Sequence, residues 1–415
     1  MDFLVVMTFG RAGMIHPSLA AMVDAIKGKI SRVAMHQRFT KAAVSFLEKC
    51  LCFILKQKVH SMACLQTKLL DRFVRVLLFD SSSWDVSPKL KNILPGCGGS
   101  ASGANCKIQT CYEYRRGELS FFDMMAGTKS DNAYTAHLPD YIQTKDLILF
   151  DLGYFCLNTF LGIIRKGAFF LSRFLIGTSL FHAETGLPLV LEKMLTKVQN
   201  NIFEIPVILG AEKEKQFPCR LICLRVSEQV ANQHRRRLKK EAQKKGRTPS
   251  QKHLILADWI LMITNVPQEW LPTQMVRPLY SLRWQIELLF KQIKSVLQIH
   301  HSNTGKENRL RCEIYGKLIV AILFHRIHAI LNISLWNEQG KELSMEKLYK
   351  RIQERSFLIA DLLLCSVSMT VSYLKKEVPK LIKNCIKSYQ ISRKSTLQIV
   401  EFGIPYSGGV LSMVA

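Results

Sequence analysis

The spacing of apolar side chains divides the chain into helical and strand-like stretches. From about residue 17 to residue 55, apolar residues recur every three or four positions, which predicts amphipathic helices. Within this stretch, residues 29–40 resemble the turn and second helix of a helix-turn-helix. The period then changes, and Val74–Phe79 is a mostly apolar run that predicts a buried strand ending on Asp80.

The middle of the chain predicts more strands, at residues 106–114, 119–126, 147–150, 167–174 and 259–264. The first two are joined by a short polar link and predict a hairpin, and the third ends on Asp151. Between residues 175 and 254, strand-like pieces alternate with polar connections, so we expect a β-rich insertion there. From about residue 308 to residue 383 the pattern is helical.

The segment from Tyr280 to Lys294 predicts one helix with two distinct faces. At 100° per residue, one side collects apolar residues: Leu282, Ile286, Leu289, Phe290, Ile293 and Leu297. The opposite side collects Tyr280, Arg283, Glu287, Lys291 and Lys294. A single carboxylate inside a basic stripe suits a metal ion beside a phosphate backbone. The alternative is an ordinary surface helix supported by Glu–Lys pairs.

Composition favours a nucleic-acid partner. Lys and Arg number 58 against 32 Asp and Glu, a formal net charge of +26, and the pI is about 9.7. Such an excess, spread along the chain, indicates a polyanion, and nucleic acid before a membrane. A hydrophobic content of 48% excludes a largely disordered protein. The apolar runs 318–324 and 357–364 are short and predict core helices, so we expect no membrane partner.

The cysteines and the N-terminus indicate the compartment. Twelve cysteines are scattered singly without a CxxC pair, which disfavours both a zinc site and a disulfide framework. We therefore expect reduced thiols. The N-terminus carries Asp2 and no basic region before an apolar run, so a signal peptide is not expected. Together these features predict a cytoplasmic protein.

Three carboxylates are candidates for one metal centre. Asp80 and Asp151 each follow an apolar run, and acids at the ends of buried strands converge at one edge of a sheet. Glu287 from a packed helix would complete the set. Carboxylate oxygens suit Mg²⁺ or Mn²⁺, and two such ions can stabilise the attacking and leaving oxygens of an in-line displacement. The alternative for each Asp is a helix cap or a turn, with Asp85 and Asp258 as competitors.

A basic run and two tryptophans are candidates for contacts to DNA. The run contains Arg235, Arg236, Arg237, Lys239 and Lys240. Such a cluster predicts phosphate contacts, and the alternative is a solvated basic helix or loop. Trp284 borders the polar face of the 280–294 helix and is a candidate for stacking on an extruded base. Trp259 lies in an apolar strand, and we expect it in the core.

Tyr280, Arg283, Glu287 and Lys294 follow the spacing Y-x2-R-x3-E-x6-K. This segment resembles the signature of bacterial insertion-sequence DDE transposases of the insertion-sequence-four, or YREK, family. The segments Asp80-Ser-Ser-Ser-Trp and Asp151-Leu-Gly-Tyr-Phe are similar to the two aspartate motifs of that family. The resemblance covers about residues 32–297.

The resemblance implies an α/β fold with an RNase H-like mixed sheet flanked by helices, a β-rich insertion, and helical N- and C-terminal regions. The expected domains are a helical DNA-binding region at 1–65, an RNase H-like core at 66–174 and 255–300, the insertion at 175–254, and a helical region at 301–415. Asp80, Asp151 and Glu287 would be the catalytic metal-binding triad. Tyr280, Arg283 and Lys294 would hold phosphates, and helical position adds Lys291.

The implied function is cut-and-paste transposition. The enzyme would cleave DNA at terminal inverted repeats and join the ends to target DNA. It would act as a homodimer in a paired-end complex at the bacterial nucleoid, with two Mg²⁺ or Mn²⁺ ions. The alternatives are a general Mg²⁺-dependent nuclease and a transposase-derived DNA-binding protein that no longer cleaves. The short N-terminal region and the unusual ending from Tyr406 also raise the expectation of a truncated element.

Overall fold

The structure, a computed structural model, describes residues 2–10, 18–57, 64–98, 102–302, 304–388 and 395–402. The ending from Tyr406 lies outside these residues. The chain consists of two compact units. Unit 1 comprises Met1–Gln66, Leu77–Ser130 and Trp284–Ile391, and unit 2 comprises Thr67–Val76, Asp131–Arg283 and Ser392–Ala415. The domain ranges expected from the sequence stay predictions.

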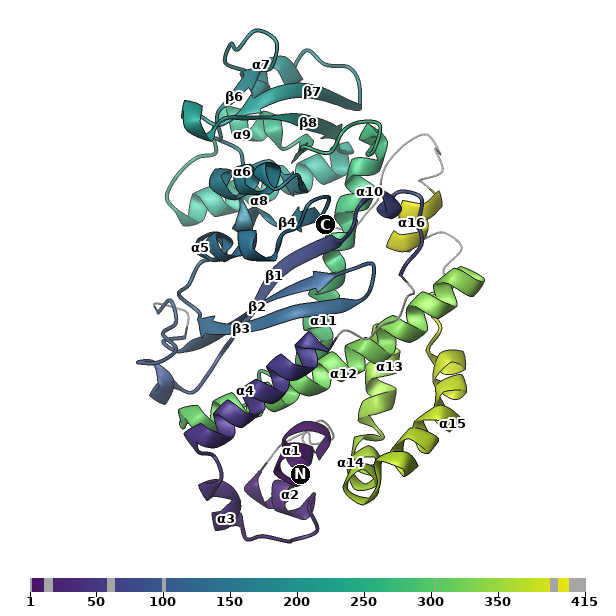
Figure 1. The fold of residues 1–415 in the computed structure, drawn as a ribbon. Helices are drawn as coiled ribbons and strands as arrows, with labels where there is room; N and C mark the ends of the chain where they lie inside the picture. The colour runs from purple at the N-terminus through teal and green to yellow at the C-terminus, as the bar shows by residue number, and fades with distance from the viewer. Residues whose placement is uncertain are drawn as a thin grey trace. The chain divides into compact units, whose positions relative to one another are not determined.

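Unit 1 is largely helical (Figure 1). Its helices are α1 (Asp2–Val5), η1 (Val6–Gly10), α2 (Leu19–Asp24), α3 (Arg32–Gln37), α4 (Lys41–Lys56), α11 (Trp284–Ser295), α12 (Glu307–Gln339), α13 (Met345–Gln353), α14 (Ser356–Cys365) and α15 (Val367–Cys385). The side chains of Ser18, Ser31 and Thr40 accept backbone hydrogen bonds at the starts of α2, α3 and α4. Seven residues, 25–31, separate α2 from α3, which is longer than the three- or four-residue turn of a helix-turn-helix.

The long helix α12 forms the core of unit 1 and lies alongside α4 (Figure 1). By length and composition it is the one helix among those described that is apolar enough to cross a membrane, but 61% of its most apolar window is buried inside the protein. Gly316 lets η1 approach closely, because a Cβ there would lie 2.1 Å from the carbonyl oxygen of Met7. These features are typical of a core helix, as the sequence predicts.

Three antiparallel strands of unit 1 pair in the order β3-β2-β1. They are β1 (Val76–Asp85), β2 (Asn105–Glu113) and β3 (Glu118–Ala126), so the predicted hairpin is confirmed. The prediction that the first strand ends on Asp80 is wrong, since β1 continues to Asp85, paired with Asn105. Polar residues can continue this strand because, beyond its first four residues, only Trp84 is buried, and an antiparallel pair tolerates a solvated face.

Unit 2 contains a mixed sheet flanked by helices. Its strands are β4 (Leu147–Phe150), β5 (Phe169–Arg173), β6 (Leu180–His182), β7 (Ile202–Leu209), β8 (Phe217–Arg225) and β9 (Trp259–Thr264), in the order β4-β5-β9-β8-β7-β6. The pair β4–β5 is parallel and the others are antiparallel. The strands predicted for residues 175–254 therefore extend this sheet from β9.

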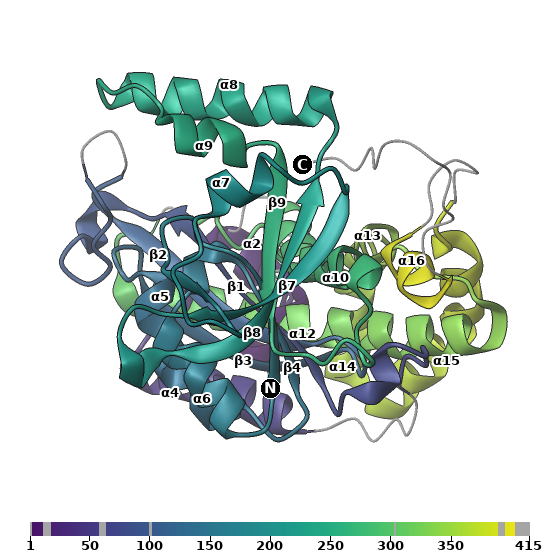
Figure 2. The ribbon, with the colours of Figure 1, turned by 90° about the horizontal axis from the view of Figure 1, so that it is seen from above.

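The helices of unit 2 are α5 (Asp131–Tyr134), α6 (Leu157–Arg165), α7 (Leu191–Leu195), α8 (Glu228–Lys244), α9 (Gln251–Leu256), α10 (Val276–Tyr280) and α16 (Thr396–Phe402). Helices α8 and α9 lie side by side (Figure 2). Ser227 and Ser250 are the N-cap residues of these helices, since each hydroxyl accepts a backbone hydrogen bond from the first turn. The basic run of the sequence is thus helical and belongs to α8.

Two buried histidines of α12 predict a loss of stability in acid. Burial lowers the pKa of His325 to about 3 and that of His328 to about 4. Unfolded histidines titrate near pH 6.5, so below about pH 6.5 the unfolded chain takes up protons that the folded chain refuses. Between about pH 6.5 and its pKa in the folded protein, we expect each histidine to lower the free energy of unfolding by about 1.4 kcal/mol per pH unit.

Thermal unfolding from about pH 7 to about pH 5 measures this effect. The variant His325→Phe keeps an aromatic ring against Tyr112, whose centroid lies 4.8 Å away, and removes one titrating group. Its melting temperature should fall less steeply with pH than that of the wild type. Equal slopes in the two proteins would contradict the assignment.

Candidate functional site

Unit 1 carries two of the three candidate carboxylates. Asp80 lies on β1, directly after the buried residues Val76–Phe79, and its Oδ1 accepts the Ser81 N–H at 2.8 Å. Glu287 lies in the first turn of α11. Both side chains are partly buried. Each acid is therefore held on a regular element of unit 1.

A hydrogen bond joins the elements that carry Asp80 and Glu287. The Nζ of Lys294 on α11 donates to the carbonyl oxygen of Ser83 on β1 at 2.9 Å. Glu287 lies seven residues before Lys294, about 10 Å along the helix axis. Asp80 lies three residues before Ser83, about 10 Å along the strand. The bond therefore joins α11 to β1 at a point about 10 Å along each element from its acid. Burial lowers the pKa of Lys294.

The predicted 280–294 helix is interrupted. Helix α10 ends at Tyr280, a 3₁₀ turn covers Ser281–Arg283, and α11 begins at Trp284. The Ser281 hydroxyl donates to the Pro278 carbonyl oxygen at 2.6 Å and so competes with helical bonding. The apolar face is confirmed, because all six of its residues are buried: Leu282, Ile286, Leu289, Phe290, Ile293 and Leu297.

Unit 2 gathers the other signature residues around Asp151. Asp151 directly follows β4, and its Oδ1 accepts the Leu152 N–H at 2.7 Å. The Tyr280 hydroxyl donates to the carbonyl oxygen of Phe150 at 3.0 Å. The Arg283 guanidinium carbon lies 5.9 Å from the centroid of the Tyr280 ring. Burial, opposed by Arg283 and reinforced by Asp151, raises the pKa of Tyr280 to about 12.

Sequence analysis missed two arginines in this part of unit 2. The parallel register Phe150↔Ser172 puts Arg173, the last residue of β5, in line with Asp151. Arg277 lies on α10, one turn before Tyr280. Each has a signal in the sequence. Arg173 lies at the end of an apolar strand, as Asp151 does, and Arg277 precedes Tyr280 by three residues, one helical turn.

The basic helix α8 separates into paired and exposed cations. Arg235 forms ion pairs with Glu228, at 3.0 Å, and with Asp258. The other four candidates are exposed, and no ion pair involves them within the described chain: Arg236, Arg237, Lys239 and Lys240. Trp259 is in the core, as predicted, and Trp284 is 51% exposed. The exposed groups can reach a ligand, whereas Arg235 is engaged within the chain.

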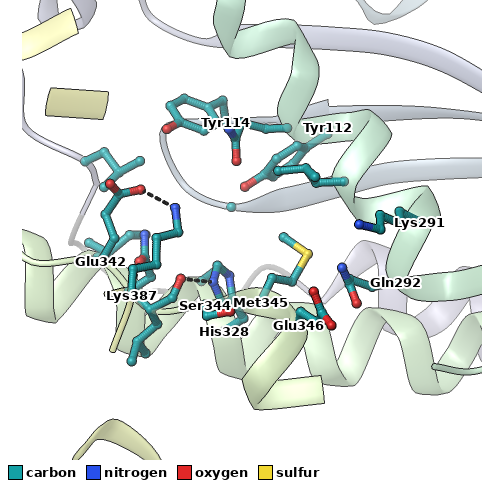
Figure 3. Close-up of a pocket in the computed structure, with 18 residues that line it drawn as sticks. Tyr112, Tyr114, Lys291, Gln292, His328, Glu342, Ser344, Met345, Glu346 and Lys387 are labelled. Atoms are coloured by element: carbon teal, nitrogen blue, oxygen red, sulfur yellow. Dashed lines mark hydrogen bonds and ion pairs between the residues drawn. The ribbon is translucent and has the colours of Figure 1, made fainter. Parts of the chain in front are cut away.

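Lys291 borders a hollow of about 160 Å³ in unit 1 (Figure 3). Tyr112 and Tyr114 form one side of this hollow, and His328 and Met345 lie on another. The pKa of Glu346, which also lines it, is lowered chiefly by Lys350 and further by Lys291. Lys291 therefore has an acidic neighbour on α13, and its predicted contact to DNA stays a prediction.

The candidate carboxylates fit a divalent metal by their chemistry. Asp and Glu oxygens are the hard ligands that Mg²⁺ and Mn²⁺ take, and all three acids are partly buried. In the part of the chain that the structure describes, no three His, Cys, Asp or Glu side chains are gathered closely enough to hold a metal. Asp80 and Glu287 belong to unit 1 and Asp151 to unit 2, so the triad stays a prediction.

This chain is similar to known proteins of one family. A family model described as a transposase DDE domain matches residues 71–323. The transposase for insertion sequence element IS231F of Bacillus thuringiensis subsp. israelensis is 30% identical over 410 residues, which cover 94% of this chain and 85% of the relative. The transposase for IS1151 of Clostridium perfringens is 29% identical and covers 80% of this chain and 73% of the relative.

One solved structure, a piggyBac transposase synaptic complex with hairpin DNA, is similar with a TM-score of 0.45 at 11% identity. The similarity covers 94% of this chain and 77% of that chain.

Proposed function

This chain belongs to the transposase DDE domain family, and from that premise we propose that it cuts terminal inverted repeats and joins them to target DNA by cut-and-paste transposition. The observation that carries the proposal is the signature spacing of Tyr280, Arg283, Glu287 and Lys294 inside the matched range. The same spacing supports membership of the YREK group. Asp80 and Asp151 also lie inside the matched range.

The three acids are the proposed catalytic centre. DDE transposase domains use divalent metal ions, and we propose that Asp80, Asp151 and Glu287 hold two Mg²⁺ or Mn²⁺ ions. Such ions lower the pKa of water and stabilise charge on the attacking and leaving oxygens of a phosphodiester. The hydrogen bond from Lys294 to Ser83 supports the pairing of Asp80 with Glu287, because it fixes the helix of one to the strand of the other.

The remaining signature residues position DNA. Tyr280 stays protonated at neutral pH, so it acts as a hydrogen-bond donor to Phe150 and not as a base. Its ring supports the guanidinium of Arg283, which we propose contacts a phosphate near the cleaved bond. The exposed cations of α8 would contact phosphates farther along the duplex. Joining two ends makes a homodimer in a paired-end complex the simplest assembly, with DNA as its partner.

Removal of the metal tests the proposed function. A labelled duplex that ends in the element's own inverted repeat should be cut at the repeat boundary in Mg²⁺. Cleavage should stop in excess chelator and return when Mg²⁺ or Mn²⁺ is added back, because the acids alone do not activate water. Cleavage that persists in chelator would contradict a metal centre. Equal cutting of an unrelated duplex would indicate a general nuclease.

A further inference from the structure

Two arginines of unit 2 carry their charges without an acidic partner. Arg173 ends β5 and is exposed, and Arg277 lies on α10 and is partly buried. No ion pair or side-chain hydrogen bond joins either residue to another side chain in the described part of the chain. Buried arginines are usually paired, so the partly buried Arg277 is the unusual member of the two.

Arg173 lies beside Asp151, and Arg277 lies near Arg173. The register Phe150↔Ser172 aligns Arg173 with Asp151 on neighbouring parallel strands, where aligned side chains share a face of the sheet. Helix α10 packs on β5 and brings Arg277 one turn before Tyr280, which is bonded to the residue preceding Asp151. Burial lowers the pKa of Arg277, and the nearby charge of Arg173 lowers it further.

The nearby acids Asp151 and Glu401 form no ion pair with these arginines in the described residues. Asp151 is aligned with Arg173, but its Oδ1 accepts the N–H of Leu152. On α16, which packs on α10, the Glu401 carboxylate accepts the N–H of Lys68 at 3.3 Å. Two like charges, one of them partly desolvated, therefore lie near each other, and within the described residues no acidic side chain forms an ion pair with either of them. This arrangement costs stability in the free protein and is relieved when an anion binds.

We propose that Arg173 and Arg277 form an anion site that binds a DNA phosphate next to Asp151. A guanidinium presents paired N–H donors that match two phosphate oxygens, which a lysine does not. Neither residue belongs to the Y-x2-R-x3-E-x6-K signature. The assignment of DNA as the source of the phosphate rests on the proposed function, whereas the anion chemistry rests on the arginines themselves.

Thermal unfolding in inorganic phosphate tests the anion chemistry without DNA. Relative to chloride at equal ionic strength, phosphate should raise the melting temperature of the wild type, because a ligand that binds only the folded state stabilises it. The gain should be lost in Arg277→Gln and in Arg173→Gln. Without phosphate, Arg277→Gln should melt at the same or a higher temperature than the wild type, because the like-charge contact is gone. Arg165→Gln, an exposed arginine at the end of α6, is the control and should keep the gain.

Duplex binding as a function of salt tests the source of the phosphate. Arg173→Gln and Arg277→Gln should each weaken binding by on the order of tenfold and reduce the slope of log K against log salt by about 1. Arg277→Lys should restore the slope but only part of the affinity, since it keeps the charge and loses the paired donors.

The outcomes separate this inference from the proposed function. Equal stabilisation by phosphate of the wild type and both Gln variants would overturn the anion site, even if the enzyme cuts DNA. A phosphate effect that needs both arginines, with unchanged duplex binding, would overturn DNA as the ligand. If the phosphate effect needs both arginines but the wild type never cuts an inverted-repeat end, the anion site stands and the proposed function fails.

Discussion

Glu287→Gln should abolish cleavage at the inverted-repeat end while leaving folding and DNA binding intact. The amide is nearly isosteric but is a much poorer ligand for a hard divalent ion. Glu287 sits in the first turn of α11, whose apolar face is buried, so the substitution leaves the packing of the helix unchanged. We expect the single-turnover rate to fall by at least about a thousandfold, or about 4 kcal/mol of activation free energy.

Glu307→Gln is the matched control. Glu307 also begins a helix, α12, and its carboxylate accepts the Arg311 Nε–H at 2.7 Å on the same helix. Its loss removes a partly exposed ion pair, so cleavage should stay within about twofold of the wild type. Undiminished end cleavage by Glu287→Gln would overturn the role of Glu287. Loss of cleavage in both variants would point to damage of the fold.

Neutralising the exposed face of α8 should weaken DNA binding for every sequence. The variant replaces Arg236, Arg237, Lys239 and Lys240 with Gln and leaves the paired Arg235 in place. If each cation contacts one phosphate, the slope of log K against log salt should fall by about 3–4, because roughly 0.9 counterions are released per contact. Binding at moderate salt should weaken by on the order of a hundredfold or more.

A variant with equal charge loss separates a contact from a change in net charge. Lys341, Lys375, Lys376 and Lys383 are exposed in unit 1, and their replacement with Gln removes the same four charges. Fluorescence anisotropy of a labelled duplex across a salt series measures both variants. We expect the control to change the slope much less. Equal slopes for the two variants would show that α8 contributes only long-range charge.

Local patterns in the sequence predicted the elements that carry the candidate site. The apolar stripe from Leu282 to Leu297 is buried as expected, because a helical period alone decides which face packs. The hairpin of β2 and β3 follows from two alternating runs around Gly117, whose φ of 68° suits a tight turn. The strand before Asp151 ends where the apolar run ends.

Features that depend on distant partners were not predictable in the same way. β1 continues past Asp80 because β2 supplies hydrogen bonds to its polar half, and no property of residues 80–85 alone indicates that pairing. The 3₁₀ turn before α11 contains Ser281, whose hydroxyl donates to the carbonyl oxygen of Pro278, and the helical pattern of the sequence does not show this interruption. Arg173 and Arg277 become neighbours only when α10 packs on β5. The metal-binding role of the three acids was predicted from the two strand-end aspartates and the polar helix face and is implied by the family signature, and it remains a proposal.

Rescue by a thiophilic metal tests the three-carboxylate centre most directly. Asp80→Cys, Asp151→Cys and Glu287→Cys should each bind the inverted-repeat duplex like the wild type but fail to cut it in Mg²⁺. A thiolate prefers softer ions, so Mn²⁺ or Cd²⁺ should restore cleavage in each variant. Restoration in all three would place every acid at the metal. Full activity of any variant in Mg²⁺, or no restoration by the softer ions in a variant that still binds DNA, would contradict the proposed centre.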